Sequence, residues 1–152
     1  MWKPPLLALL LLSPAPPAGG GGRDALMDEI ERKVVLPDGA RPLRDYGRNY
    51  ALAGRGIVRG TYLLPLPPRD PASGCAVMLP DLTSRPCTRK EVRQSVAAEA
   101  ALTAAQTRAG TRRWFDDPRR LPRIFDGGCA QVTVEYDVAA HHVLAVACNG
   151  DA

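Results

Sequence analysis

The residues best suited to acid, base or metal chemistry are few and lie near the carboxyl end of the chain. The only histidines are His141 and His142, which are adjacent. A histidine could serve as a general base or a metal ligand. Neighbouring strand residues point to opposite faces, so this pair is not expected to share an ion. We interpret both as surface residues at the end of a hairpin. The alternative is a small hydrolase in which scattered carboxylates and a histidine converge after folding, with Asp126 as a candidate.

A second group combines positive charge with aromatic rings. Such a surface could hold phosphate, lipid A or an anionic glycan through charge and stacking. Because Asp116 and Asp117 lie within the group and lower its net charge, we favour a solvated face whose rings cover the core. Anion binding remains the alternative, and nucleic acid is not an expected partner. The candidate anion-binding residues are Arg112, Arg113, Trp114, Arg119, Arg120 and Arg123.

Four cysteines follow the amino-terminal region: Cys75, Cys87, Cys129 and Cys148. An even number of cysteines after an export signal favours disulfides over free thiols. The sequence contains no CxxC or CxxxC pair, so no zinc site is expected. The sequence also lacks the GxSxG, HExxH and P-loop motifs of hydrolases, metalloproteases and nucleotide-binding proteins. We therefore expect no cofactor and find no recognisable catalytic motif.

The first residues have the pattern of an export signal. Lys3 precedes an apolar run from Leu6 to Leu12, and serine, proline and then small residues follow. The run is about one third of the roughly 20 residues that a membrane-spanning helix needs, so no transmembrane anchor is expected in the mature chain. We predict a signal peptide over residues 1–20, with cleavage after Ala18 or Gly22 as alternatives, and a single domain over residues 21–152. The other interpretation is an apolar tail that folds onto the domain.

Composition supports export from a bacterium. Arginine greatly outnumbers lysine, and alanine, glycine and proline are abundant, which is typical of GC-rich bacterial genomes. An exported bacterial chain would work in the periplasm or be secreted. Its large apolar side chains are scarce, which makes covalent support by disulfides plausible.

Local patterns predict an alternation of helices and strands. Thr88 and Glu91 form a capping box before an alanine-rich stretch, which predicts a helix that ends near Gln106. Prolines between residues 65 and 74 predict an extended connection. The other predicted elements are a helix over 24–33, a helix from Pro42 with Leu43, Tyr46 and Tyr50 on one face, and strands over 57–64 and 75–79.

Two alternating segments, 131–136 and 143–147, predict a carboxyl-terminal hairpin. If Tyr136 faces His141, Glu135 faces His142 and Cys129 faces Cys148. Opposed residues of antiparallel strands are about 4.5 to 5.5 Å apart, a span that a disulfide accepts. By elimination Cys75 pairs with Cys87.

These elements predict an α+β fold: a small antiparallel sheet with a carboxyl-terminal β-hairpin, packed against two or three helices and held by two disulfides. The favoured function is a periplasmic or secreted non-enzymatic domain that binds an envelope protein or an anionic envelope component. The alternatives are the small hydrolase and the anion-binding module formed by Arg112 to Arg123.

Three groups of segments resemble small, uncharacterised exported proteins of alphaproteobacterial type. The resemblance implies an envelope location and no particular activity or site residue. The segments are Ile30–Arg32 with Leu36–Ala40, Asp45–Tyr46 with Asn49–Ala51, and Ile124–Cys129.

Overall fold

The structure is a computed structural model that describes residues 20–67 and 74–150. The expected signal peptide lies outside this part except for Gly20, and so do residues 68–73 of the proline-rich connection. The helices are α1 (Gly20–Lys33) and α2 (Arg89–Ala105). The strands are β1 (Gly47–Leu52), β2 (Ile57–Leu63), β3 (Ala76–Met78), β4 (Ser84–Pro86), β5 (Arg112–Phe115), β6 (Gly128–Asp137) and β7 (His142–Asn149). The predicted α+β class is confirmed.

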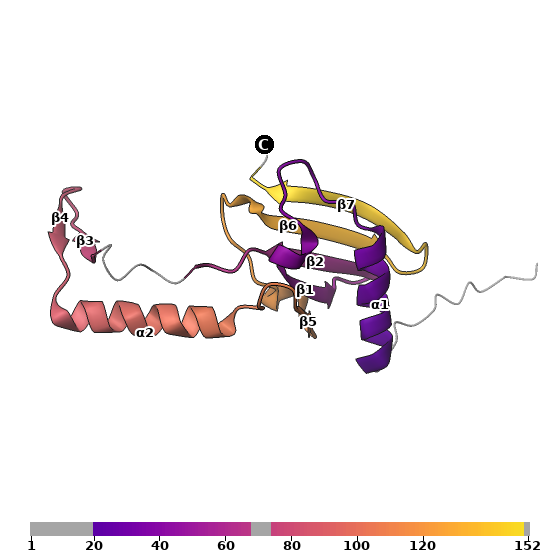
Figure 1. Ribbon diagram of the computed structural model, residues 1–152, viewed down its shortest axis with the longest axis horizontal. Helices are drawn as coiled ribbons and strands as arrows, with labels where there is room; N and C mark the ends of the chain where they lie inside the picture. Colours follow the sequence, from indigo (N-terminus) through magenta and orange to yellow (C-terminus); the bar gives the residue numbers. More distant parts are fainter. Residues whose placement is uncertain (1–19, 68–73, 151–152) are drawn as a thin grey trace, which may run out of the picture.

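The main sheet has five strands in the order β5-β1-β2-β6-β7 (Figure 1). Neighbouring strands are antiparallel except that β5 runs parallel to β1, so the sheet is mixed. Strand β5 was not predicted, because it has only four residues and two of them are arginines. The short strands β3 and β4 form a separate antiparallel hairpin.

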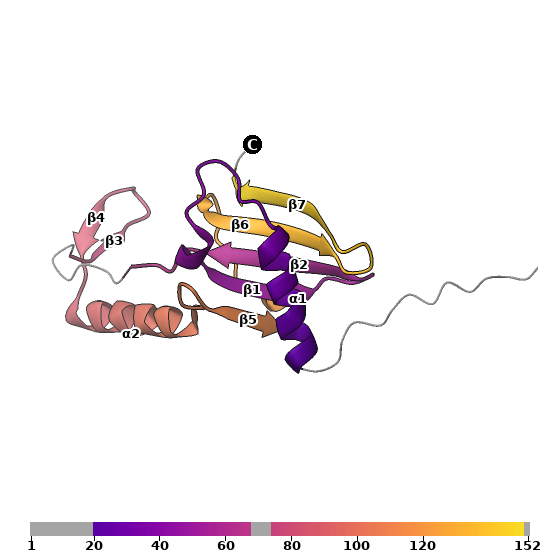
Figure 2. The ribbon, with the colours of Figure 1, turned by 45° about the vertical axis from the view of Figure 1, so that its right-hand side comes forward.

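The core lies between α1 and one face of the main sheet, which the helix crosses (Figure 2). Helix α1 covers the predicted segment 24–33 and buries Leu26, Met27 and Ile30. They pack with apolar and tyrosine side chains of the sheet. Those side chains include Tyr50, Tyr62, Val132, Val134 and Tyr136.

The prediction of a helix that begins at Pro42 is wrong. A short 3-10 turn over Leu43–Asp45 leads directly into β1. Tyr46 and Tyr50 are both fully buried, as expected of core residues. Their spacing of four places them on one side of a strand as well as of a helix, which is why the pattern was ambiguous. Gly47 disfavours a helix, and a Cβ there would lie 1.9 Å from the Thr107 carbonyl oxygen.

The carboxyl-terminal hairpin is confirmed, but its predicted register is wrong over most of its length. Tyr136 faces Val143, and His142 faces Asp137 rather than Glu135. The pairing shifts at two irregularities, one between Gly128 and Val132 and one between Glu135 and Tyr136. Between them Val132 faces Cys148. A bulge inserts an unpaired residue, and residue patterns alone did not reveal it.

Both predicted disulfides are present. Cys75 bonds to Cys87 with Cα atoms 5.3 Å apart, and Cys129 bonds to Cys148 with Cα atoms 4.5 Å apart. Across residues 20–67 and 74–150, no helix has the length and apolar composition needed to cross a membrane. The disulfides are consistent with an oxidising compartment.

Candidate binding surface

The structure does not bring the histidines and Asp126 together. His141 lies in the turn between β6 and β7, while Asp126 precedes the far end of β6. The ten residues of β6 separate these ends by about 33 Å. The arrangement therefore gives no support to a hydrolase site built from these residues. In the part of the chain that is described, no group of three or more acidic, histidine or cysteine side chains is placed to hold a metal.

His141 instead joins a polar cluster between α1 and the hairpin, which the sequence analysis missed. Glu29 accepts hydrogen bonds from Lys33 Nζ at 2.9 Å and from the Tyr136 hydroxyl at 2.7 Å. His141 Nδ1 lies 2.8 Å from the same carboxylate oxygen. The bonds from Lys33, Tyr136 and His141 lower the pKa of Glu29 to about 2. Only the Glu29–Lys33 spacing was visible in the sequence.

At neutral pH this carboxylate is ionised, and its Oε1 oxygen contacts all three partners. An acid catalyst near neutral pH needs a raised carboxyl pKa, so the shift at Glu29 has the wrong sign for that role. Lys33 Nζ also donates to the His141 carbonyl at 2.6 Å. The cluster therefore fixes α1 to the end of the hairpin.

A second polar network lies deeper, between α1 and β1. Arg48 Nε is 2.9 Å from Glu31 Oε1, and the Tyr50 hydroxyl donates to the same oxygen at 2.9 Å. The Tyr50 and Tyr62 hydroxyls are 3.0 Å apart. Burial raises the pKa of both tyrosines, which keeps them neutral. The network balances a mostly buried charge pair and has a structural role.

The predicted anion-binding residues are divided among several local contacts. Arg112 is hydrogen-bonded to Asp28, and Arg119 pairs with Asp117 at 2.9 Å. Arg113 lies over the Phe115 ring at 4.7 Å, and Trp114 is covered by Arg23 at 5.4 Å. These contacts use much of the charge and ring surface on which the expectation was based.

Arg120 and Arg123 form no ion pair with another residue that the structure describes. Arg123 lines a pocket, considered below, that the other five candidates do not line. Anion binding by the whole Arg112–Arg123 group stays a prediction.

The largest departure from the expected fold is a projection that we call the arm, residues 74–106. It is inserted between β2 and β5 and contains the β3–β4 hairpin and α2. The capping box predicted at Thr88 and Glu91 is present, and α2 ends one residue before Gln106. Helix α2 extends away from the main sheet (Figure 1) and has no buried residue.

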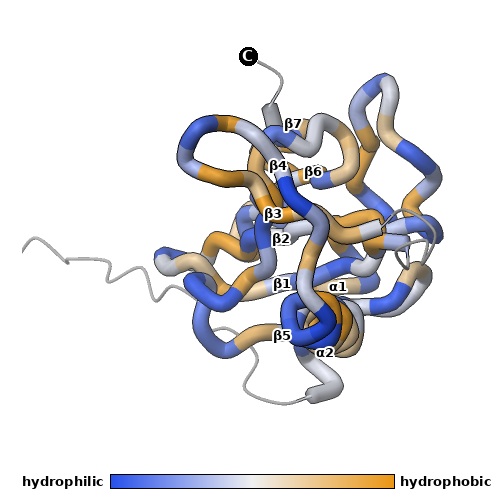
Figure 3. Tube along the Cα trace, turned by 90° about the vertical axis from the view of Figure 1, so that its left-hand side faces the viewer, coloured by the Kyte–Doolittle hydropathy of each residue, from blue (hydrophilic) through white to orange (hydrophobic). Residues whose placement is uncertain are grey.

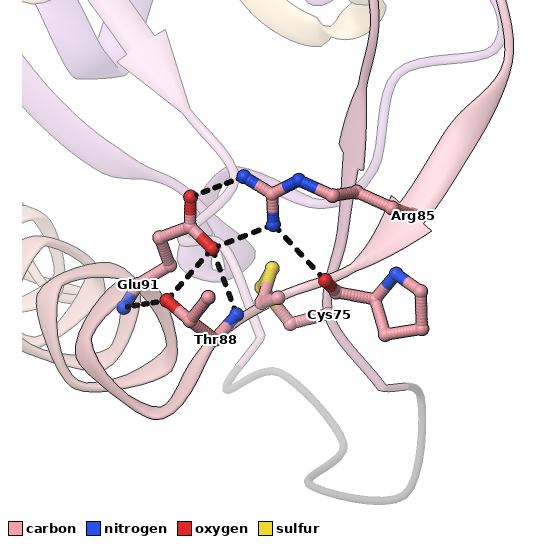
Figure 4. The surroundings of a disulfide bond; sticks show 6 residues. Cys75, Arg85, Thr88 and Glu91 are labelled. Atoms are coloured by element: carbon pink, nitrogen blue, oxygen red, sulfur yellow. Dashed lines mark hydrogen bonds and ion pairs between the residues drawn. A yellow bond between two sulfur atoms is a disulfide. The ribbon is translucent and has the colours of Figure 1, made fainter.

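Local bonds hold the hairpin and the start of α2 together (Figure 4). The Cys75–Cys87 disulfide closes the hairpin one residue before the helix cap. The Thr88 backbone amide donates to Glu91 at 2.7 Å, and Arg85 donates to the same carboxylate at 2.8 and 2.9 Å. The bonds from Arg85 and Thr88 lower the pKa of Glu91 to about 2. The carboxylate therefore stays charged throughout the ordinary pH range.

Two side-chain bonds hold the carboxyl end of the arm: Gln106 is bonded to the segment that follows β2, and the next residue, Thr107, is bonded to β1. The Gln106 side chain accepts from the Leu66 amide at 2.8 Å, and the Thr107 hydroxyl donates to Asn49 Oδ1 at 2.5 Å. Asn49 is almost completely buried within β1. These bonds hold the end of α2 beside the main sheet, although the arm has no buried residue and thus no core of its own.

The arm presents apolar side chains to solvent. Met78 is 73% exposed and Leu82 is 83% exposed on the hairpin, and Val96 and Leu102 on α2 are 62% and 63% exposed. Figure 3 shows α2 end-on, with hydrophilic and hydrophobic segments around the helix axis. Val92 is also exposed and lies four residues before Val96, so the two valines share one side of α2, and adjacent exposed apolar side chains are a feature of interaction surfaces.

Comparison with protein-family models, curated proteins and solved structures gave no match.

Proposed function

We propose that this chain is an exported, non-enzymatic binding protein of the bacterial envelope, periplasmic or secreted, and that the arm docks onto a partner protein. The leader-like residues 1–20 and the two disulfides support export. The polar clusters on α1 are engaged in internal bonds, which leaves the arm as the surface best suited to contact a partner.

The observation that carries the proposal is a 17-residue helix with no buried residue. In most proteins the greater part of a helix's stability comes from packing an apolar face against the rest of the fold rather than from intrinsic helix propensity. Here a disulfide, a capping box and the Arg85–Glu91 pair order the helix instead. Such an arrangement is suited to a surface that is held ready for a partner, because less conformational entropy is lost on binding.

Charge indicates the chemistry of the partner. Arg89, Lys90 and Arg93 lie in the first turns of α2, where positive charge opposes the helix dipole. The one acidic residue among them, Glu91, is paired with Arg85. Since these cations do not help the helix, we assign them to recognition of a partner that presents carboxylates around an apolar patch.

A pair of matched variants tests the proposal. Val92→Asp/Val96→Asp adds charge to exposed positions of α2, and Leu144→Asp makes the same kind of change on β7, where Leu144 is 51% exposed. Immobilised, oxidised protein is exposed to envelope extract from the producing bacterium, and retained proteins are identified by mass spectrometry. We expect the α2 variant to lose at least about tenfold of a specific protein that the wild type and Leu144→Asp both retain.

Equal retention by all three proteins would refute docking through the arm. Urea unfolding of each variant serves as the folding control. All three substituted residues are exposed, so each variant should stay within about 1 kcal/mol of the wild-type free energy of unfolding.

A further inference from the structure

A pocket lies at the base of the arm, on the side of β1 and β2 where the crossover from β5 to β6 passes. Its volume is about 220 Å³. An apolar cavity of about 150 Å³ is large enough to hold benzene. The pocket therefore has room for a ring or a short alkyl chain.

The walls of the pocket are mainly apolar and come from three separate parts of the chain. Leu63 ends β2 and residues 64–66 follow it, Leu102 and Ala105 belong to α2, and Pro122 and Ile124 belong to the crossover. Burying an alkyl chain against these walls would be favourable, because each methylene is removed from water.

Most polar groups at the pocket are already committed to internal bonds. Asn49 donates to the Gly47 and Thr61 carbonyl oxygens and accepts from Thr107. The Gln106 side-chain oxygen accepts from the Leu66 amide. The Arg123 guanidinium differs from them, because it has no carboxylate partner among the residues that the structure describes.

From this combination we infer a ligand site for a small amphiphilic anion, such as a short-chain carboxylate, with its alkyl part among the leucines and its charged head at Arg123. Charge complementarity decides the class of ligand: the walls require an apolar body, and a guanidinium binds a carboxylate or phosphate head through paired N–H donors. The site goes beyond the proposed docking of a partner protein and uses a different part of the arm.

Octanoate and octan-1-ol are suitable probes, because they share an alkyl chain and differ in the charge of the head. Binding is followed by chemical-shift changes of backbone amides in the isotope-labelled, oxidised protein. We expect octanoate to shift the amides of Leu63, Leu64 and Leu66 and of residues 102–106, and to bind at least about fivefold more tightly than octan-1-ol.

Two variants with matched controls locate the site. Arg123→Gln should reduce the affinity for octanoate about five- to tenfold and leave octan-1-ol unchanged, whereas Arg120→Gln, an exposed arginine nearby, should change neither. Ala105→Trp fills the pocket and should abolish binding of both probes. Ala97→Trp, on the same helix but away from the pocket, should not.

The inference is overturned if neither probe shifts these amides, or if Ala105→Trp and Ala97→Trp bind the probes equally. It is also overturned if Arg123→Gln binds octanoate as tightly as the wild type. A neutral-ligand site is the conclusion if octan-1-ol binds as tightly as octanoate, and that result contradicts the assignment of an anion.

Discussion

At the scale of the residue, Glu29 shows how one side chain can join distant parts of the chain. Its carboxylate meets Lys33 on its own helix and the side chains of Tyr136 and His141 more than a hundred positions away. The local pair could be anticipated from the sequence, since residues four apart on a helix are neighbours. The distant contacts could not, because they depend on how α1 crosses the sheet.

The lowered pKa of Glu29 predicts an acid-dependent contribution to stability. Its folded value of about 2 lies below the ordinary value of 4.5, so the bonds stabilise the folded state above pH 4.5. That contribution is lost as the pH falls from 4.5 toward 2. With allowance for partial exposure of the cluster, Glu29→Gln should lower the free energy of unfolding by about 1 kcal/mol at pH 7.

Urea unfolding of the wild type and Glu29→Gln at pH 7 and pH 2.5 checks this prediction. The difference between the two proteins should shrink at the lower pH. A difference that is the same at both pH values would show that the carboxylate charge is not what stabilises the contact.

The element scale shows which kinds of pattern are informative. The capping box before α2 was predicted because Thr88 and Glu91 are three residues apart and determine the local hydrogen bonds. The helix expected from Pro42 was wrong because a central strand is buried on both faces and has no clear alternation. The length of α2 could be predicted, but its position away from the sheet could not.

The cap itself is open to a direct test. Thr88→Ala removes the hydroxyl that accepts from the Glu91 amide and should cost α2 about 1 kcal/mol. Amide exchange in the first turns of α2 should become several-fold faster, while exchange in β6 stays unchanged. Thr83→Ala, on the same hairpin but outside the cap, is the control and should leave α2 exchange as it is.

The disulfide of the arm should also act locally. Cys75→Ala/Cys87→Ala removes the closure of the β3–β4 hairpin, and we expect faster amide exchange throughout α2. Because the arm contributes no residue to the core, the unfolding midpoint of the main sheet should change little. A large fall in that midpoint would show that the arm and the sheet unfold as one unit.

At the scale of the whole molecule, the second disulfide has a different position. Cys129 and Cys148 join β6 to β7, and Cys148 is buried in the core. Their pairing was predicted correctly although the hairpin register was not, because pairing returns to the predicted register at Gly128 and Asn149. The five-stranded sheet with its disulfide supplies a stable body, and the arm extends from it.

Removing this disulfide should therefore weaken the entire fold. On the chain-entropy account, Cys129→Ala/Cys148→Ala should lower the free energy of unfolding by about 3 kcal/mol, measured by urea unfolding followed by far-ultraviolet circular dichroism. The Cys75→Ala/Cys87→Ala protein is the matched control. Equal losses in the two proteins would contradict the division into body and arm.

Site-specific photo-cross-linking in the producing cell shows whether the arm is the surface that contacts a partner. A benzophenone side chain is placed at position 96 on α2 or, as the control, at position 144 on β7, both of which are exposed. We expect a discrete protein adduct from position 96 and none from position 144. Equal labelling from the two positions, or no adduct from position 96, would contradict that expectation.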